Sequence, residues 1–126
     1  MTDGERRILI VEDERAMADL LEARFKKLGY DVRVAYAGEA ALEYIRAGGH
    51  DLIILDLLIP GIDGFKILKT MQTEHIKIPV IVVTNLSEAE QMDEVRLLGA
   101  IDAFIKSDIP IRRLIARVQK FFETGK

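Results

Sequence analysis

The chain has 126 residues, 49% of them hydrophobic, which predicts one globular domain over residues 1–126 with no output domain. The absence of cysteine excludes disulfides and thiolate metal sites and fits a cytoplasmic location. A formal net charge of −3 disfavours direct nucleic-acid binding, and no apolar run is long enough to span a membrane.

Five short segments rich in apolar residues are predicted strands. They are residues 8–11, 31–34, 52–55, 80–83 and 103–105. The first, third and fourth are apolar at every position, which is typical of strands buried on both faces of a parallel sheet. The second alternates polar and apolar residues, so we expect it at an edge of the sheet.

The segments between and after these strands repeat apolar residues at helical spacing. They are residues 17–28, 37–46, 65–72, 87–98 and 114–122. Gly29 and Gly99 are expected to end the first and fourth helices, and Ser87 is expected to cap the start of the fourth. Strands that alternate with helices predict an α/β fold. We expect a five-stranded parallel sheet in the order 2-1-3-4-5, with five helices on both faces, as in flavodoxin-like proteins.

Polar residues follow or end four of the predicted strands. They are Glu12 and Asp13, Asp56, Thr84 and Lys106. Each alone has an ordinary explanation as a first-turn acid, a strand-end hydroxyl or a surface lysine. Parallel strands end at the same edge of a sheet, so together these residues predict a functional site.

The chemistry of this predicted site is that of phosphoryl transfer. Clustered carboxylates repel one another unless a cation lies among them, and oxygen ligands suit Mg²⁺. Asp56 is the expected nucleophile, because carboxylates form aspartyl phosphates. Lys106 and Mg²⁺ are expected to offset charge on the phosphoryl oxygens, and Thr84 to donate a hydrogen bond to one of them.

Over its whole length the chain resembles the CheY-like receiver domain of bacterial two-component response regulators. The matching segments are residues 11–14, 56–64 and 99–100, together with Thr84 and Lys106. The resemblance implies that Asp56 accepts a phosphoryl group from a phosphohistidine of a sensor histidine kinase or phosphotransfer protein. It implies Mg²⁺ ligation by Asp13, Asp56 and the Leu58 carbonyl, with Glu12 acting through a water. It also implies that the chain is a switch with a downstream protein target and is not an enzyme, although it promotes its own phosphorylation and dephosphorylation.

The sequence departs from the family at the residues that form its switch. Receivers carry an aromatic residue three positions before the lysine, where this chain has Ala103. Phe104 is adjacent but is expected on the opposite face of the strand. Asn85 replaces a small residue after Thr84, and Ser107 replaces the usual proline. We therefore expect phosphorylation to be retained and its coupling to the surface to differ.

Two leucines and two groups of charges lead to further expectations. Leu58 and Leu86 stand where the family sets the lifetime of the phosphoryl group, and we expect slow self-dephosphorylation because an apolar side chain cannot orient water. In many receivers, which this chain resembles, the face formed by the fourth helix, fifth strand and fifth helix forms a phosphorylation-dependent homodimer, and opposite charges on the fourth and fifth helices are compatible with one here. The charges are Glu88, Glu90, Asp93 and Glu94 against Arg112, Arg113, Arg117 and Lys120. His50 and His75 are expected to be solvent-exposed.

The residues argue against two alternatives to a phosphorylated receiver. A pseudo-receiver that serves only as a protein-binding module is disfavoured, because the acids and the lysine are all present. Enzymes fit worse. A haloacid-dehalogenase phosphatase needs a second aspartate where Leu58 stands, and a flavodoxin needs a Ser/Thr/Gly-rich loop where this chain has acids.

Overall fold

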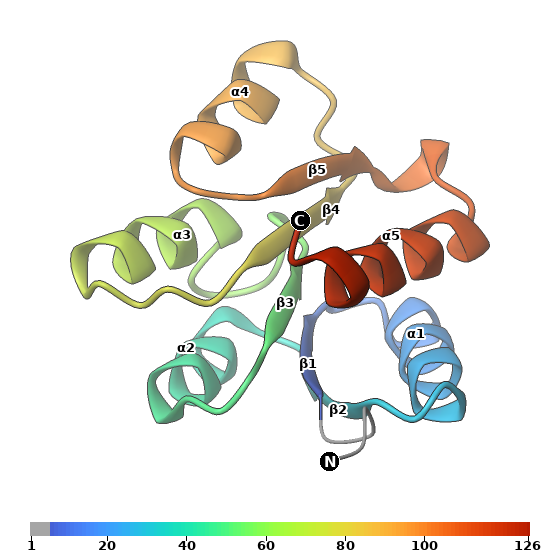
Figure 1. Cartoon of the computed structure of the whole chain (residues 1–126). Coiled ribbons are helices and arrows are strands. Elements are labelled where there is room, and N and C mark those ends of the chain that lie inside the picture. The colour runs from blue at the N-terminus through green and yellow to red at the C-terminus, as the bar shows by residue number, and fades with distance from the viewer. Residues whose placement is uncertain (1–5) are drawn as a thin grey trace.

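The computed structural model describes residues 6–126, in which five strands alternate with five helices (Figure 1). The strands are β1 (Arg7–Val11), β2 (Asp31–Ala35), β3 (Leu52–Leu55), β4 (Val80–Thr84) and β5 (Asp102–Ile105). The helices are α1 (Arg15–Lys27), α2 (Gly38–Ala47), α3 (Gly64–Thr73), α4 (Ala89–Leu97) and α5 (Ile111–Thr124). Over these described residues, no helix is both long and apolar enough to cross a membrane.

All strand pairs are parallel, and the order is β2-β1-β3-β4-β5, so the predicted α/β fold is confirmed. Alternate residues of β1 face opposite sides of the sheet. Leu9 and Val11 pack in a core with α2, α3 and α4, whereas Ile8 and Ile10 pack in a second core with α1 and α5. Figure 1 shows these two layers of helices around the sheet. Strand β2 forms an edge, as its alternating pattern predicts.

Helix α4 begins later than the sequence predicts, and the expected cap at Ser87 is wrong. Glu88 occupies the cap position, with extended backbone and no capping hydrogen bond from its side chain. Its carbonyl accepts the backbone N–H groups of Gln91 and Met92, both at 3.1 Å, which fixes the first turn one residue later. Glu90 in that turn interacts favourably with the helix dipole.

The prediction of an exposed His50 is also wrong, because this residue is 8% exposed. Gly48 and Gly49 both have positive φ and reverse the chain after α2, and His50 lies beside the first residues of β1 and β2. Among the described residues 6–126, neither of its ring nitrogens has a hydrogen-bond partner. His75, by contrast, is exposed as expected.

The burial of His50 predicts a pH-dependent stability. Burial, followed by the positive charges of Arg7 and Arg33, lowers the pKa of His50. As the pH falls, His50 of the unfolded chain, with an ordinary histidine pKa near 6.5, therefore takes up a proton at a higher pH than His50 of the folded chain does. The stability of the fold consequently decreases as the pH drops below that value. From pH 7.5 to pH 5.5 we expect the wild type to lose about 1 kcal/mol more than His50→Gln. Urea unfolding at both pH values measures this loss. His75→Gln is the control and should lose as much as the wild type; equal losses in His50→Gln and wild type would contradict the prediction.

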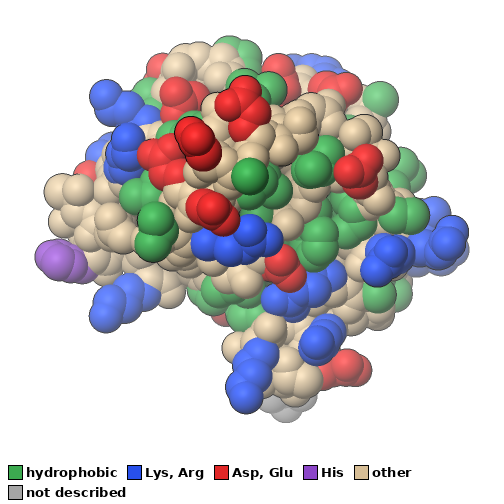
Figure 2. Space-filling view, turned by 90° about the horizontal axis from the view of Figure 1, so that it is seen from above, with side chains coloured by type: hydrophobic (Ala, Val, Ile, Leu, Met, Phe, Trp, Pro, Cys, Tyr) green, Lys and Arg blue, Asp and Glu red, His purple; other side chains and the backbone are tan. Residues whose placement is uncertain are grey.

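The charges on α4 and α5 are not all available to a second copy. Seen from above, acidic side chains gather over the upper middle of the surface, and basic ones lie both around its edge and in its centre (Figure 2). Arg117 is already paired within the chain, since its Nε donates to Asp102 Oδ2 at 2.7 Å. A homodimer through this face would therefore depend on the exposed Arg112, Arg113 and Lys120.

Candidate functional site

The predicted site residues lie at the carboxyl ends of four strands. Glu12 and Asp13 follow β1, Asp56 follows β3, Thr84 ends β4 and Lys106 follows β5. Backbone pairing continues one residue past the strands and fixes the acids, because Asp56 N donates to the Val11 carbonyl and Glu12 N to the Ala35 carbonyl, both at 3.0 Å. Hydrophobic strands thus deliver charged residues to this edge at defined positions.

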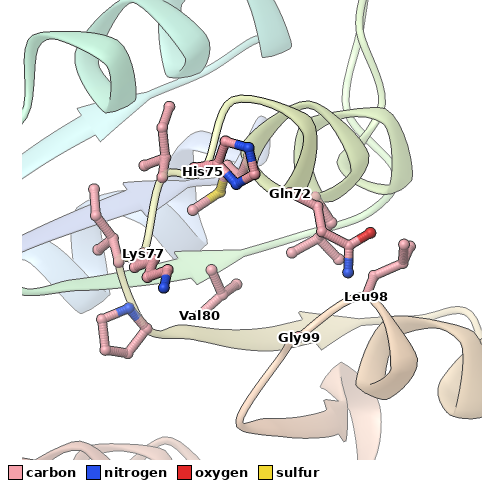
Figure 3. Close-up of a pocket in the computed structure, with 11 residues that line it drawn as sticks. Gln72, His75, Lys77, Val80, Leu98 and Gly99 are labelled. Atoms are coloured by element: carbon pink, nitrogen blue, oxygen red, sulfur yellow. The ribbon is translucent and has the colours of Figure 1, made fainter.

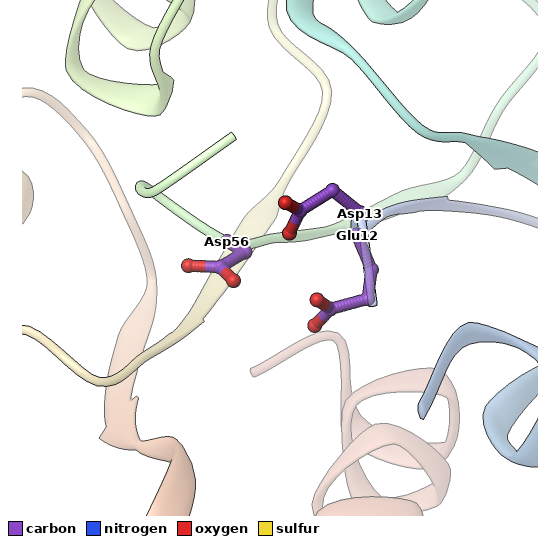
Figure 4. A group of neighbouring side chains, drawn as sticks. All are labelled: Glu12, Asp13 and Asp56. Atoms are coloured by element: carbon purple, nitrogen blue, oxygen red, sulfur yellow. The ribbon is translucent and has the colours of Figure 1, made fainter. Parts of the chain in front are cut away.

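Three carboxylates meet at this edge. One side-chain oxygen each from Glu12, Asp13 and Asp56 lies within 4.8 Å of the other two, and Figure 4 shows the three side chains converging. Glu12 is 3% and Asp56 4% exposed, whereas Asp13 is exposed and open to solvent. An all-oxygen donor set with one solvent-exposed member fits a hard cation such as Mg²⁺, which keeps part of its water.

Lys106 contacts this cluster through its ammonium group. Nζ lies 2.7 Å from Asp56 Oδ2, 2.9 Å from Glu12 Oε1 and 2.8 Å from Glu14 Oε1. The lysine side chain is 10% exposed, so its charge is largely shielded from water. The structure therefore brings Glu12, Asp13, Asp56 and Lys106 together although they are far apart in the sequence.

The pKa values at this edge depend on the balance between burial and ion pairing. Burial raises the pKa of Glu12, and hydrogen bonds from Lys106 and the Glu14 backbone only partly oppose it. Burial alone would lower the pKa of Lys106, but hydrogen bonds to Asp56, Glu14 and Glu12 outweigh it and raise that pKa above its usual value. A hydrogen bond from Lys106 holds the pKa of Glu14 below its usual range. Lys106 therefore stays positively charged.

The loop after Asp56 is held by backbone contacts. Leu58 N donates to Asp56 Oδ1 at 3.0 Å, and Gly64 N donates to the Leu57 carbonyl at 3.0 Å. A Cβ at Gly64 would lie 2.6 Å from Leu57 Cα, so only glycine permits this approach. Gly38 N donates to the Pro60 carbonyl at 3.1 Å, and its Cβ position overlaps the Ile62 carbonyl. The sequence offered no signal for this role of Gly38, because the two segments meet only in the fold.

The remaining predicted residues surround the cluster. Thr84 is fully buried, and its hydroxyl accepts the Leu86 N–H at 3.4 Å. Ala103 packs in the core with α2, α3 and α4, whereas Phe104 packs against the core with α1 and α5. This confirms that the two side chains face opposite sides of the sheet. Asn85 is exposed at the surface. Leu58 is 52% exposed and Leu86 is half-buried. After β5, Lys106–Asp108 form a single 3₁₀ turn.

A groove of about 410 Å³ lies at the other end of β4, where that strand begins (Figure 3). It is formed by the end of α3, the connection to β4 and the end of α4, and none of its lining residues is acidic. His75 and Lys77 are the titratable residues in its lining. The carboxylates and Lys106 lie at the opposite ends of the strands from this groove.

Comparison with known proteins places this geometry in a family. Residues 8–119 match the family model of the response regulator receiver domain. The chain is 30% identical to the Francisella response regulator 1452 receiver domain, with a TM-score of 0.88 over 96% of this chain and 99% of that one. It is 29% identical to the BeF3-activated N-terminal receiver domain of Klebsiella pneumoniae RstA, with a TM-score of 0.82 over 90% and 96%.

A third solved structure is a putative response regulator from Chloroflexus aurantiacus J-10-fl, 32% identical with a TM-score of 0.80 over 91% of this chain and 95% of that one. The match to the family model includes β1 from its second residue on, the other four strands and the acidic edge of the sheet. The parallel sheet in the order β2-β1-β3-β4-β5 agrees with this family. This chain belongs to the response regulator receiver domain family.

Proposed function

We propose that the chain is a phosphoacceptor switch of two-component signalling and that Asp56 is the residue phosphorylated. The observation that carries the proposal is the buried Asp56 carboxylate, 2.7 Å from the Lys106 ammonium and beside two further acids. A buried carboxylate paired with a lysine at the carboxyl ends of parallel strands is positioned to react with a ligand there. The donor is a phosphohistidine of a sensor kinase or phosphotransfer protein.

In the proposed reaction an Asp56 oxygen attacks the phosphorus atom of the donor. A P–O bond to Asp56 forms as the P–N bond to the donor histidine breaks, and the imidazole leaves with the electron pair and takes up a proton. The Lys106 ammonium offsets negative charge on the phosphoryl oxygens, and the Thr84 hydroxyl donates a hydrogen bond to one of them. The chain acts as a switch that promotes its own phosphorylation and the later loss of the phosphoryl group, and not as a turnover enzyme.

Mg²⁺ fits the donor set of this site. Asp13, Asp56 and the Leu58 carbonyl would hold the ion, with Glu12 acting through a water. When bound, Mg²⁺ supplies positive charge to the phosphoryl oxygens. Between the three carboxylates and Lys106, the chain's own residues leave a net negative charge that favours a divalent cation.

The output is proposed to be a change at the surface of α4, β5 and α5, in a cytoplasmic protein with a downstream protein target. Ala103 offers no aromatic ring to move inward, so the signal passes from Thr84 through its neighbour Leu86 to α4. Leu58 and Leu86 carry no group that would orient an attacking water, which supports slow loss of the phosphoryl group. A phosphorylation-dependent homodimer through this face is a further proposal.

Acetyl phosphate tests the metal requirement. Intact mass spectrometry of the wild type should show one added phosphoryl group with Mg²⁺ present and none with a chelator. An adduct formed equally well without Mg²⁺ would overturn the metal's role. If no adduct forms and beryllofluoride also fails to bind, the pseudo-receiver that acts as a protein-binding module becomes the better description.

A further inference from the structure

Glu14 is a third carboxylate partner of Lys106, and its role is not explained by the cluster of Glu12, Asp13 and Asp56. Its Oε1 lies 2.8 Å from Lys106 Nζ, while its side chain remains 62% exposed. Glu14 is also the cap residue of α1, yet its side chain makes no capping hydrogen bond. The side chain therefore extends to Lys106 and leaves the helix end without a side-chain cap.

The contacts of Lys106 use its full hydrogen-bonding capacity. An ammonium group has three N–H donors and no acceptor. Nζ donates to three carboxylates, to Asp56 Oδ2 at 2.7 Å, to Glu14 Oε1 at 2.8 Å and to Glu12 Oε2 at 3.1 Å. Phosphorylation converts the Asp56 carboxylate into an uncharged acyl group, so Lys106 must turn from Asp56 Oδ2 to a phosphoryl oxygen while Glu12 and Glu14 still compete for its N–H groups.

The two carboxylates that remain differ in what their release would entail. Glu12 is buried, at 3% exposed, so leaving it unpaired costs several kcal/mol of desolvation. Glu14 is exposed and can rotate into water, where its charge is solvated and an ion pair contributes little. Glu14 is therefore the partner that Lys106 gives up most readily.

We propose that Glu14 competes with the incoming phosphoryl group for Lys106 and so lowers the affinity of the site for that group. This inference rests on the proposed function of Asp56 and adds a residue that limits it. In the unphosphorylated protein Glu14 holds Lys106. After phosphorylation its carboxylate is displaced, and its negative charge lies close to the phosphoryl oxygens and repels them.

The test is the affinity of the full chain for beryllofluoride, a phosphoryl mimic, measured by titration calorimetry at saturating Mg²⁺. Glu14→Gln keeps the length of the side chain and removes its charge. We expect it to bind beryllofluoride about three-fold more tightly than the wild type, the range of an exposed ion pair. A variant that merely damaged the fold would bind more weakly, so tighter binding identifies competition.

Two further variants complete the design. Glu22→Gln is the matched control, because it removes the same charge from α1 and an ion pair with Lys26, 2.9 Å away, outside the site; its affinity should equal that of the wild type. Glu14→Asp keeps the charge but shortens the side chain by one methylene, and should give an intermediate affinity. Equal or weaker binding by Glu14→Gln, with wild-type binding intact, would overturn this inference alone. If neither protein binds beryllofluoride, the proposed function fails together with it.

Discussion

The Asp56→Asn variant is expected to gain no phosphoryl group from acetyl phosphate under conditions that modify the wild type once. A carboxamide oxygen is not a nucleophile of the strength that forms an acyl phosphate, so the loss should be complete. The fold should persist, because the carboxamide oxygen still accepts the Leu58 N–H that Asp56 Oδ1 accepts at 3.0 Å. Intact mass after equal incubation measures the loss.

The control for this variant lies in the same loop. Asp63 caps α3 by accepting the Lys66 N–H at 2.9 Å. Asparagine caps helices as well as aspartate does, so Asp63→Asn removes one charge near the site and leaves the helix start intact. It should be phosphorylated like the wild type. A phosphoryl adduct retained by Asp56→Asn would show that another residue is the acceptor.

Lys106→Met is expected to destabilise the protein by about 3 kcal/mol at pH 7.5 without Mg²⁺. The change removes the ammonium that contacts Asp56 and Glu12, and leaves two buried carboxylates facing each other. Burial already raises the pKa of Glu12, and loss of the opposing hydrogen bond from Lys106 raises that pKa further, so Glu12 binds a proton more tightly in the folded than in the unfolded state. Protonation of Glu12 therefore restores stability as the pH falls, and the deficit should be smaller at pH 5.5.

Urea unfolding with and without Mg²⁺ checks this expectation. Mg²⁺ should restore part of the stability of Lys106→Met, because a cation again lies among the carboxylates. Lys69→Met is the control, because Lys69 is exposed and its ion pair with Glu94 is long, at 3.8 Å. This variant should change stability by less than about 0.5 kcal/mol. Wild-type stability of Lys106→Met would mean that the ion pairs at the site contribute nothing to folding.

The sheet and the main site residues were predictable because hydrophobic patterns report burial directly. The run at residues 52–55 is apolar at every position and is fully buried as β3, whereas the alternation at residues 31–34 marks the edge strand β2. Parallel strands end together, so Asp56 and Lys106 could be placed side by side although 50 residues separate them. The spacing of apolar residues and the topology of parallel sheets were therefore sufficient to predict the sheet and the placement of these two residues.

The residues that escaped prediction depend on contacts between distant segments. His50 is buried because, after a glycine turn, it packs beside the beginnings of β1 and β2. Glu14 looks like an ordinary first-turn acid until Lys106 reaches it from the end of β5. Gly38 lies against the loop after Asp56, which no local pattern announces. These features arise from tertiary packing, and spacing along one segment does not encode them.

The most direct test of the central claim is to locate the phosphoryl group in the wild-type chain. After incubation with acetyl phosphate and Mg²⁺, borohydride reduces an aspartyl phosphate to homoserine, and mass spectrometry of peptides identifies the position. The account predicts homoserine at position 56 and unmodified carboxylates at Glu12, Asp13 and Glu14. Homoserine at Asp13, or phosphate on any residue other than Asp56, would contradict it.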